Sequence, residues 1–154
     1  MQRKIRRSDR ASAEGEARKL LEKGEYGVLS TVSGDGQPYG VPVNYACARE
    51  FIYFHCATKG HKLDNLSGNN KVSFCVVGKT QVLPEQFATK YESAIVFGQA
   101  LEVFEDEKRL ALLELVKKYS PEFIEKGRQY IESDERKTRV YKIAIEALTG
   151  KTRK

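Results

Sequence analysis

The sequence predicts a mainly β domain, in which about six antiparallel strands close into a small barrel with helices at its margins. Short apolar runs separated by glycine-containing or polar turns are typical of strands joined by hairpins. A chain of 154 residues is long enough for one buried core and too short for two. No internal repeat or low-complexity linker divides the sequence. We therefore expect one domain over residues 11–154, preceded by a basic arm at residues 1–10.

The first part of this domain is predicted to be a helix followed by three strands. Ser12 as a cap, Leu20 and Leu21 as core residues and Gly24 as the stop predict a short helix over residues 12–24. Two apolar runs then flank the turn at 34–36, and a third follows the polar turn at 49–50. This pattern predicts a three-stranded antiparallel meander.

Two prolines, Pro38 and Pro42, lie within the second strand of this meander. Proline has no backbone N–H to donate to a neighbouring strand, so within sheets it is confined mainly to edges and bulges. We therefore expect at least one side of this strand to face something other than a neighbouring strand.

The second part of the domain alternates predicted strands with predicted helices. Apolar periodicity and turn residues define each element, and Gly98 marks a bend in the longest strand. The predicted elements are a helix at 60–69, a strand at 71–78, an irregular loop at 79–90, a strand at 91–104, helices at 106–119 and 120–131, and a final strand at 138–148.

The charge of the chain is concentrated at its two ends. The net charge is +6, of which residues 1–10 contribute +4 and residues 149–154 contribute +3, so the body between them sums to −1. A basic arm can bind polyanions without sequence preference, but no basic stripe is visible along the body. Nucleic-acid binding through the arm is therefore an alternative to the main interpretation given below.

Cysteine usage and hydropathy predict a cytoplasmic protein. Cys47, Cys56 and Cys75 are odd in number and lie in apolar runs, which is typical of reduced, buried thiols. No apolar run approaches the roughly 20 residues that cross a bilayer. We therefore expect no membrane partner.

The stretch "HCATKGHK", residues 55–62, concentrates chemically active side chains. His55 and Cys56 are adjacent on a predicted strand and so point to opposite faces, which argues against a zinc site. No metal is expected.

The same stretch lies where a strand turns into a helix, and this favours an anion site. The first N–H groups of a helix are free, and its dipole attracts negative charge at that end. Thr58 adds a hydroxyl donor, Gly60 permits close approach of the backbone, and Lys62 adds a full charge. The alternative interpretation is a solvated helix start without a ligand.

Four segments together resemble a known family. "GVLSTVSGDGQPYGVPVNY", "IYFHCATKGHKLDNLSGNNKVSF", "YESAIVFGQALEV" and "TGKTR" follow one another as in the pyridoxamine 5′-phosphate oxidase-like FMN-binding split barrels. Within that family the chain is most similar to the nitroimidazole-resistance branch. The resemblance begins near Gly24 and implies a homodimer of six-stranded split barrels, with FMN in clefts at the subunit interface.

The resemblance also implies which residues surround FMN. The second strand would lie along the isoalloxazine ring, and the pair His61-Lys62 corresponds to the Arg-Lys pair that holds the phosphate in the oxidases. Ser93 lies on the strand that completes the cleft, from the same or the other subunit. The implied cofactor-binding residues are Val41, Pro42, Val43, Asn44, His55, Cys56, Ala57, Thr58, His61, Lys62 and Ser93.

The function that follows from the resemblance is electron transfer through FMN. Electrons would pass from a reduced donor such as NAD(P)H to a small acceptor, either a nitroaromatic or a quinone. His55 is the catalytic candidate, as a hydrogen-bond donor or proton source beside the ring, and its alternative role is that of a structural strand histidine. The tail "EALTGKTRK" lacks the arginine and histidine motifs that hold pyridoxamine phosphate, so that substrate is not expected. The alternatives are a flavin or haem-binding module without turnover, and a nucleic-acid-associated protein.

Overall fold

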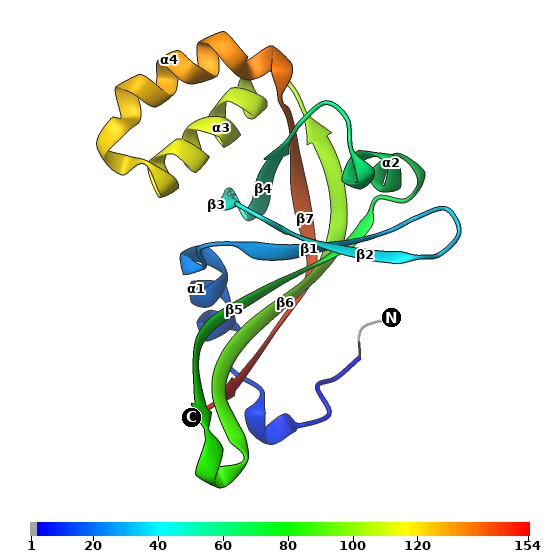
Figure 1. Ribbon diagram of the computed structural model, residues 1–154, viewed down its shortest axis with the longest axis vertical. Helices are drawn as coiled ribbons and strands as arrows, with labels where there is room; N and C mark the ends of the chain where they lie inside the picture. The colour runs from blue at the N-terminus through cyan, green and yellow to red at the C-terminus, as the bar shows by residue number, and fades with distance from the viewer. Residues whose placement is uncertain (1–2) are drawn as a thin grey trace.

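One curled sheet of seven antiparallel strands forms the fold in residues 3–154, the part of the chain that the computed structural model describes (Figure 1). The strands are β1 (Gly27–Val32), β2 (Pro38–Val43), β3 (Ala46–Ala48), β4 (Phe51–Cys56), β5 (Lys71–Leu83), β6 (Ala88–Val103) and β7 (Arg139–Arg153). The α-helices are α1 (Glu14–Lys23), α2 (His61–Gly68), α3 (Glu105–Tyr119) and α4 (Ile124–Asp134). The mainly β class predicted from the sequence is confirmed.

The order of the strands explains why the barrel is split. The sheet runs β2-β1-β5-β6-β7-β4-β3, so its two outer strands are β2 and β3. These strands are consecutive in the chain, since β2 ends at Val43 and β3 begins at Ala46. The chain itself therefore bridges the open side of the curled sheet. The strand count is seven rather than six because the predicted second strand is broken at this bridge.

The predicted three-stranded meander is wrong in one pairing. Strand β1 pairs with β2, and β3 pairs with β4 across a tight turn in which Arg49 and Glu50 both have positive φ. The other neighbour of β4 is β7, not β2. Within the described residues β2 pairs with β1 alone, so the open side predicted from Pro38 and Pro42 is confirmed.

The predicted loop at 79–90 is instead the end of a long hairpin. Strand β5 continues to Leu83, a short 3-10 turn spans Pro84–Gln86, and β6 begins at Ala88. Figure 1 shows this hairpin extending away from the rest of the sheet. The predicted bend at Gly98 is confirmed by a register shift between Phe97 and Gly98 where β6 pairs with β7. A Cβ at Gly98 would lie 2.0 Å from the carbonyl oxygen of Ala144, so only glycine fits there.

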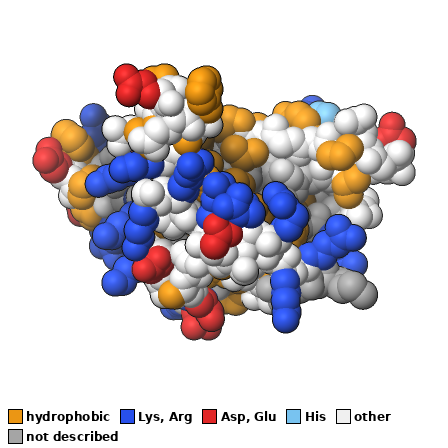
Figure 2. All heavy atoms as spheres, turned by 90° about the horizontal axis from the view of Figure 1, so that it is seen from below, with side chains coloured by type: hydrophobic (Ala, Val, Ile, Leu, Met, Phe, Trp, Pro, Cys, Tyr) orange, Lys and Arg blue, Asp and Glu red, His pale blue; other side chains and the backbone are white. Residues whose placement is uncertain are grey.

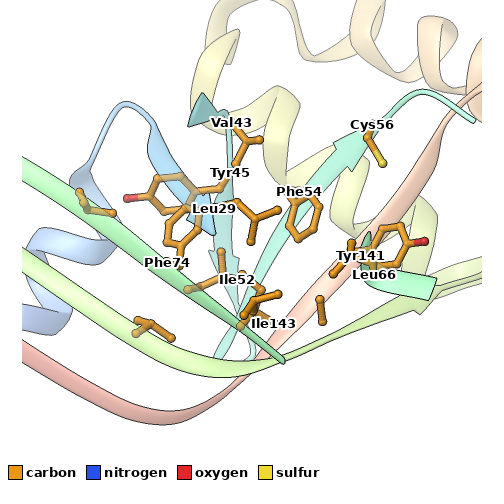
Figure 3. Close-up of a cluster of buried hydrophobic side chains, with 14 of the residues drawn as sticks. Leu29, Val43, Tyr45, Ile52, Phe54, Cys56, Leu66, Phe74, Tyr141 and Ile143 are labelled. Atoms are coloured by element: carbon orange, nitrogen blue, oxygen red, sulfur yellow. The ribbon is translucent and has the colours of Figure 1, made fainter. Parts of the chain in front are cut away.

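The main core lies inside the curve of the sheet (Figure 3). Side chains from several strands meet there, and the rings of Tyr45 and Phe74 contact each other edge to face with centroids 4.9 Å apart. The Tyr45 hydroxyl donates a hydrogen bond to the carbonyl of Leu21 in α1. The bridge between β2 and β3 is therefore packed into the core, and α1 covers it.

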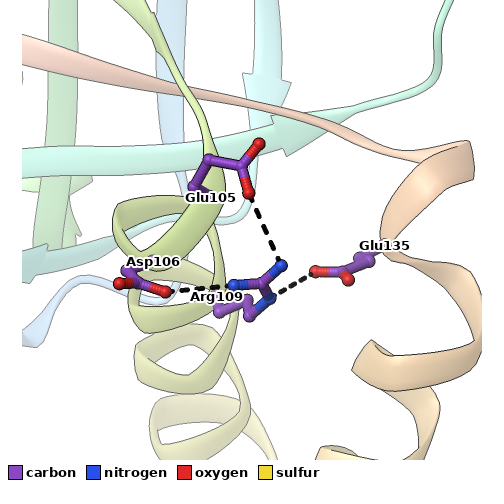
Figure 4. A network of polar contacts seen from close by, with 4 residues as sticks. All are labelled: Glu105, Asp106, Arg109 and Glu135. Atoms are coloured by element: carbon purple, nitrogen blue, oxygen red, sulfur yellow. Dashed lines mark hydrogen bonds and ion pairs between the residues drawn. The ribbon is translucent and has the colours of Figure 1, made fainter.

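A second core cluster lies on the opposite face of the sheet under α3 and includes Tyr53, Val103, Ala111 and Val140. Arg109 connects α3 to the segment after α4, since its Nε donates to Glu135 at 3.0 Å and its Nη1 to Asp106 at 3.0 Å (Figure 4). These ion pairs are exposed, so each contributes little to stability. None of the helices described, from α1 to α4, is long and apolar enough to cross a membrane.

Candidate functional site

The stretch 55–62 has the strand, turn and helix that the sequence predicts. Strand β4 ends at Cys56 and α2 begins at His61, so residues 57–60 form the turn. Gly60 has φ of +152° and nothing lies within 4 Å of where its Cβ would be, so the backbone is open to solvent there. Thr58 and His61 are exposed and Lys62 is half-buried. The start of α2 is therefore accessible, and a hydroxyl, an imidazole and an ammonium group surround it as possible hydrogen-bond donors.

Two contacts hold α2 against the hairpin of β1 and β2. The His61 ring stacks on the Tyr39 ring of β2, with centroids 3.9 Å apart and planes 25° apart. One helical turn later, the buried Nδ2 of Asn65 donates to the Oγ1 of Thr31 in β1 at 2.9 Å. The N-terminus of α2 is consequently placed beside β2, the strand that was predicted to lie along a cofactor ring.

The alternation predicted for His55 and Cys56 is confirmed, since His55 is exposed and Cys56 is 9% exposed. Partial desolvation, followed by the positive charge of Lys62, lowers the pKa of His55. Burial raises the pKa of the Cys56 thiol, and Lys62 opposes that rise. Lys62 is thus close enough to influence both side chains. His55 is accordingly neutral at pH 7, and Cys56 is a protonated thiol.

In residues 3–154, no three side chains of His, Cys, Asp or Glu gather in a way that could hold a metal ion.

The predicted ring-binding segment forms an edge of the sheet. Val41 is half-buried, Val43 is buried, and Pro42 and Asn44 are exposed. Because β2 pairs only with β1 in the described residues, one row of its backbone N–H and C=O groups is left without a strand partner. A planar ligand with polar edges can use such a row.

The end of this strand is held by α3, which the sequence did not indicate. The N–H of Tyr45 donates to the Tyr119 hydroxyl at 3.0 Å, and the Lys118 Nζ donates to the Tyr45 carbonyl at 2.9 Å. The same Lys118 Nζ lies 3.6 Å from the centroid of the Tyr45 ring. These residues are 73 and 74 positions from Tyr45 in sequence, so no local pattern could reveal them.

Ser93 lies apart from the other predicted residues within one chain. It lines a groove of about 890 Å³ between α1 and the hairpin of β5 and β6, and of the predicted residues only Ser93 lines that groove. Ala100 lies next to the end of α2, since its N–H donates to the Asn70 carbonyl at 2.8 Å. Ser93 is seven residues from Ala100 on the same strand, or about 23 Å at the usual rise per residue. A single chain therefore does not bring Ser93 to the start of α2.

The outer face of the sheet carries an apolar surface that the sequence analysis missed. Phe97 is 49% exposed, Val77 58%, Leu101 43% and Val28 36%. The registers place them on neighbouring strands: Val28 lies opposite Cys75 on β5, and Phe97 lies opposite Ser73 of that strand. We call Val28, Val77, Phe97 and Leu101 the outer apolar face. The apolar run from Ala94 to Phe97 in β6 was the available signal, because a strand covered on one face only would alternate.

Comparison with known proteins identifies the family. The family model of pyridoxamine 5′-phosphate oxidase matches residues 13–152. The chain belongs to this family. The resemblance noted in the sequence is thereby confirmed, and no curated protein matches the chain.

Solved structures share the split-barrel fold of this pyridoxamine 5′-phosphate oxidase family member. A candidate 5-nitroimidazole antibiotic resistance protein of Bacteroides thetaiotaomicron VPI-5482 has 21% identity and a TM-score of 0.72, over 91% of this chain and 84% of that one. A FAD-binding protein of Mesorhizobium loti has 23% identity and a TM-score of 0.67, over 92% and 93%. A FAD and heme binding protein of Mycobacterium smegmatis has 20% identity and a TM-score of 0.81, over 93% and 73%. At identities of 20–23%, the similarity to these structures shows a shared fold and nothing further.

Proposed function

We propose that the chain is an FMN-binding flavoprotein that transfers electrons from a reduced donor such as NAD(P)H to a small acceptor, a nitroaromatic or a quinone. The observation that carries this proposal is that the N-terminus of α2 lies beside the open edge of β2. The stacked rings of His61 and Tyr39, with centroids 3.9 Å apart, hold it there. An anion site next to an unpaired strand edge matches a ligand with a phosphate at one end and a flat polar ring at the other. The names of two similar structures, a FAD-binding and a FAD and heme binding protein, agree with a flavin.

The residues at the phosphate end fit the group. The free N–H groups at the start of α2 and the helix dipole favour a dianion, and Lys62 adds a positive charge on the first turn. No side chain at Gly60 obstructs the approach of phosphate oxygens to the backbone. Thr58 is exposed and free to donate its hydroxyl hydrogen. His61 keeps its ring edge available, because stacking on Tyr39 occupies only a ring face.

The residues at the ring end are suited to a flavin. Residues Val41 to Asn44 would present unpaired backbone groups to the polar edge of the isoalloxazine, while Val41 and Val43 contribute apolar contact. Bound FMN supplies the chemistry of accepting a hydride and releasing electrons singly or in pairs. His55, held neutral by its surroundings, would offer one ring N–H as a hydrogen-bond donor to the reduced ring or the acceptor. Cys56 and Ala57 would line the wall between the two ends.

A homodimer is part of the proposal because one chain separates Ser93 from the phosphate end. The outer apolar face would be the contact surface, since it exposes four large apolar side chains on adjoining strands. Burying such a face on a second copy is favourable at about 25 cal/mol per Å² of apolar area. A second copy, placed over that face, would bring its own Ser93 strand toward the cleft beside β2 of the first.

Titration of FMN against the purified protein tests the proposal, with flavin fluorescence as the signal. We expect saturable quenching at one FMN per chain, and in Lys62→Ala a dissociation constant raised about 10-fold or more, which corresponds to loss of one charged hydrogen bond. Lys126→Ala is the matched control and should change affinity little, because Lys126 is exposed on α4, away from α2 and β2. Absence of binding at about 100 μM FMN, with the chain folded, would overturn the proposal. Tighter binding of FAD or haem than of FMN would reassign the cofactor.

A further inference from the structure

The segment just before α1 lies beside the last part of β7, although the sequence separates the two by the whole domain. The backbone N–H of Ser12 donates to the carbonyl of Gly150 at 3.0 Å, and Ala11 forms an antiparallel bridge with Lys151. The arm that precedes α1 is thereby attached to the last part of β7. Figure 1 shows the C-terminus and the short blue turn that precedes α1 at the lower end of the molecule, where the β5 and β6 hairpin also lies.

Positive charge accumulates where these segments meet. Residues 3–10, 79–92 and 149–154 together hold ten Lys and Arg against three Asp and Glu, a net charge of +7, whereas the whole chain has +6. Strand pairing connects the segments, because Tyr91 lies opposite Arg153 and Ser93 opposite Lys151. Figure 2 views the molecule from this end and shows Lys and Arg side chains over much of the surface. The basic face comprises Arg3, Lys4, Arg6, Arg7, Arg10, Lys79, Lys90, Lys151, Arg153 and Lys154.

The charges of the basic face are largely uncompensated. Arg7 pairs with Asp9 at 2.7 Å, and across residues 3–154 the other nine have no carboxylate within 4.0 Å. Tyr91 lies among them, opposite Arg153 on the neighbouring strand. A hydrogen bond from Arg10, and then the charge of Lys151, lower the pKa of its phenol despite some desolvation. Both effects stabilise the phenolate, and both come from side chains of the basic face.

We propose that the basic face binds the phosphate backbone of a nucleic acid without sequence preference. The backbone of a duplex carries one negative charge per ~1.7 Å, so several Lys and Arg side chains on one face can contact phosphates at once. An anionic membrane is the competing partner, because Phe87 is 97% exposed and Val82 69% exposed on the β5 and β6 hairpin beside the charges. We choose the nucleic acid because the charges extend over three segments, whereas these two apolar side chains lie on the hairpin alone; the vesicle comparison below separates the two partners. The proposal is independent of the flavin, since none of the ten residues is among those assigned to FMN.

A salt-dependent binding measurement tests the proposal. The probe is a fluorescein-labelled DNA duplex of about 20 base pairs, and its anisotropy is followed at about 50 and about 200 mM salt. If four phosphates are contacted, affinity should fall roughly 100-fold over this range, and an unrelated duplex sequence should bind equally well. No binding at the lower salt would overturn the proposal, as would tighter binding to vesicles with phosphatidylserine than to the duplex.

Two triple variants with equal loss of charge show whether the basic face is responsible. Lys4→Ala, Arg6→Ala and Lys154→Ala remove three exposed charges from the basic face, and the slope of log K against log salt should become shallower by about 2 to 3. Lys126→Ala, Arg128→Ala and Arg136→Ala remove three exposed charges from the helical hairpin instead. This control should keep the slope of the unaltered chain. Equal weakening in both variants would mean that total charge, not this face, drives binding, and would refute the assignment.

Discussion

The buried side chain of Asn65 donates a hydrogen bond of 2.9 Å to the hydroxyl of Thr31, and this contact joins α2 to the strand next to β2. Both residues are nearly inaccessible, Asn65 at 4% and Thr31 at 3%. Around them lie apolar side chains such as Leu63 and Leu66. The pair therefore determines where the N-terminus of α2 lies relative to the strand edge that we assign to the flavin ring.

Loss of one partner of this bond should destabilise the protein. In Asn65→Ala the Thr31 hydroxyl is left buried without its donor, so the free energy of unfolding should fall by about 1–3 kcal/mol. Urea unfolding followed by circular dichroism measures the change. The double variant Asn65→Ala with Thr31→Val should lose less stability than the sum of the two single variants, because either single change already breaks the bond. Additive effects would show that the two side chains do not interact.

The backbone contact at Gly98 should make that position intolerant of any side chain. Gly98→Ala places a methyl group on the carbonyl of Ala144 at the bulge between β6 and β7, so strands must separate locally. We expect a loss of about 1–3 kcal/mol in the free energy of unfolding, as for other overpacked sites. Gly34→Ala, where nothing lies within 4 Å, is the control and should change stability by less than about 0.5 kcal/mol. Similar values for both would contradict the close approach at the bulge.

His55 should titrate below the usual histidine pKa of about 6.5. The folded chain disfavours the protonated form of His55. Titration of His55 should therefore leave the free energy of unfolding unchanged above about pH 6.5 and lower it as the pH falls below that value. NMR of the imidazole protons measures the pKa directly, and the chain has only two histidines to assign. Lys62→Ala should raise the pKa of His55, whereas Lys59→Ala should not. A His55 pKa at or above 6.5 would contradict the desolvation of its ring, and an unchanged pKa in Lys62→Ala would mean that Lys62 does not act on it.

The outer apolar face should control the oligomeric state. Phe97→Glu places a charge at its centre, and in the proposed homodimer that charge would be buried without a partner. Sedimentation velocity should show a dimer for the unaltered chain and a monomer for Phe97→Glu. Phe123→Glu is the control, because Phe123 is 59% exposed on the helical side of the molecule. A monomer before any substitution would refute the homodimer.

Local patterns were sufficient for much of the candidate site. The strand, turn and helix of residues 51–68 follow from short-range signals, namely an apolar run, a glycine with positive φ and a helical period. The opposite orientation of His55 and Cys56 follows from strand geometry alone. The open side of β2 follows from Pro38 and Pro42, since a missing N–H is a property of the residue itself. The sequence by itself thus determined the fold class, the family and the strand, turn and helix around the 55–62 segment.

The tertiary structure decided whatever depends on contacts between distant segments. Strand β4 pairs with β7 about 90 residues later, a choice that hairpin signals cannot reveal. Lys118 and Tyr119 hold the end of β2 through atoms of Tyr45 that carry no sequence signature. Along the sequence, the basic residues of the arm and those of the C-terminal segment belong to two separate segments. Because electrostatic potentials add in space, only the pairing of Ser12 with Gly150 turns them into one basic face.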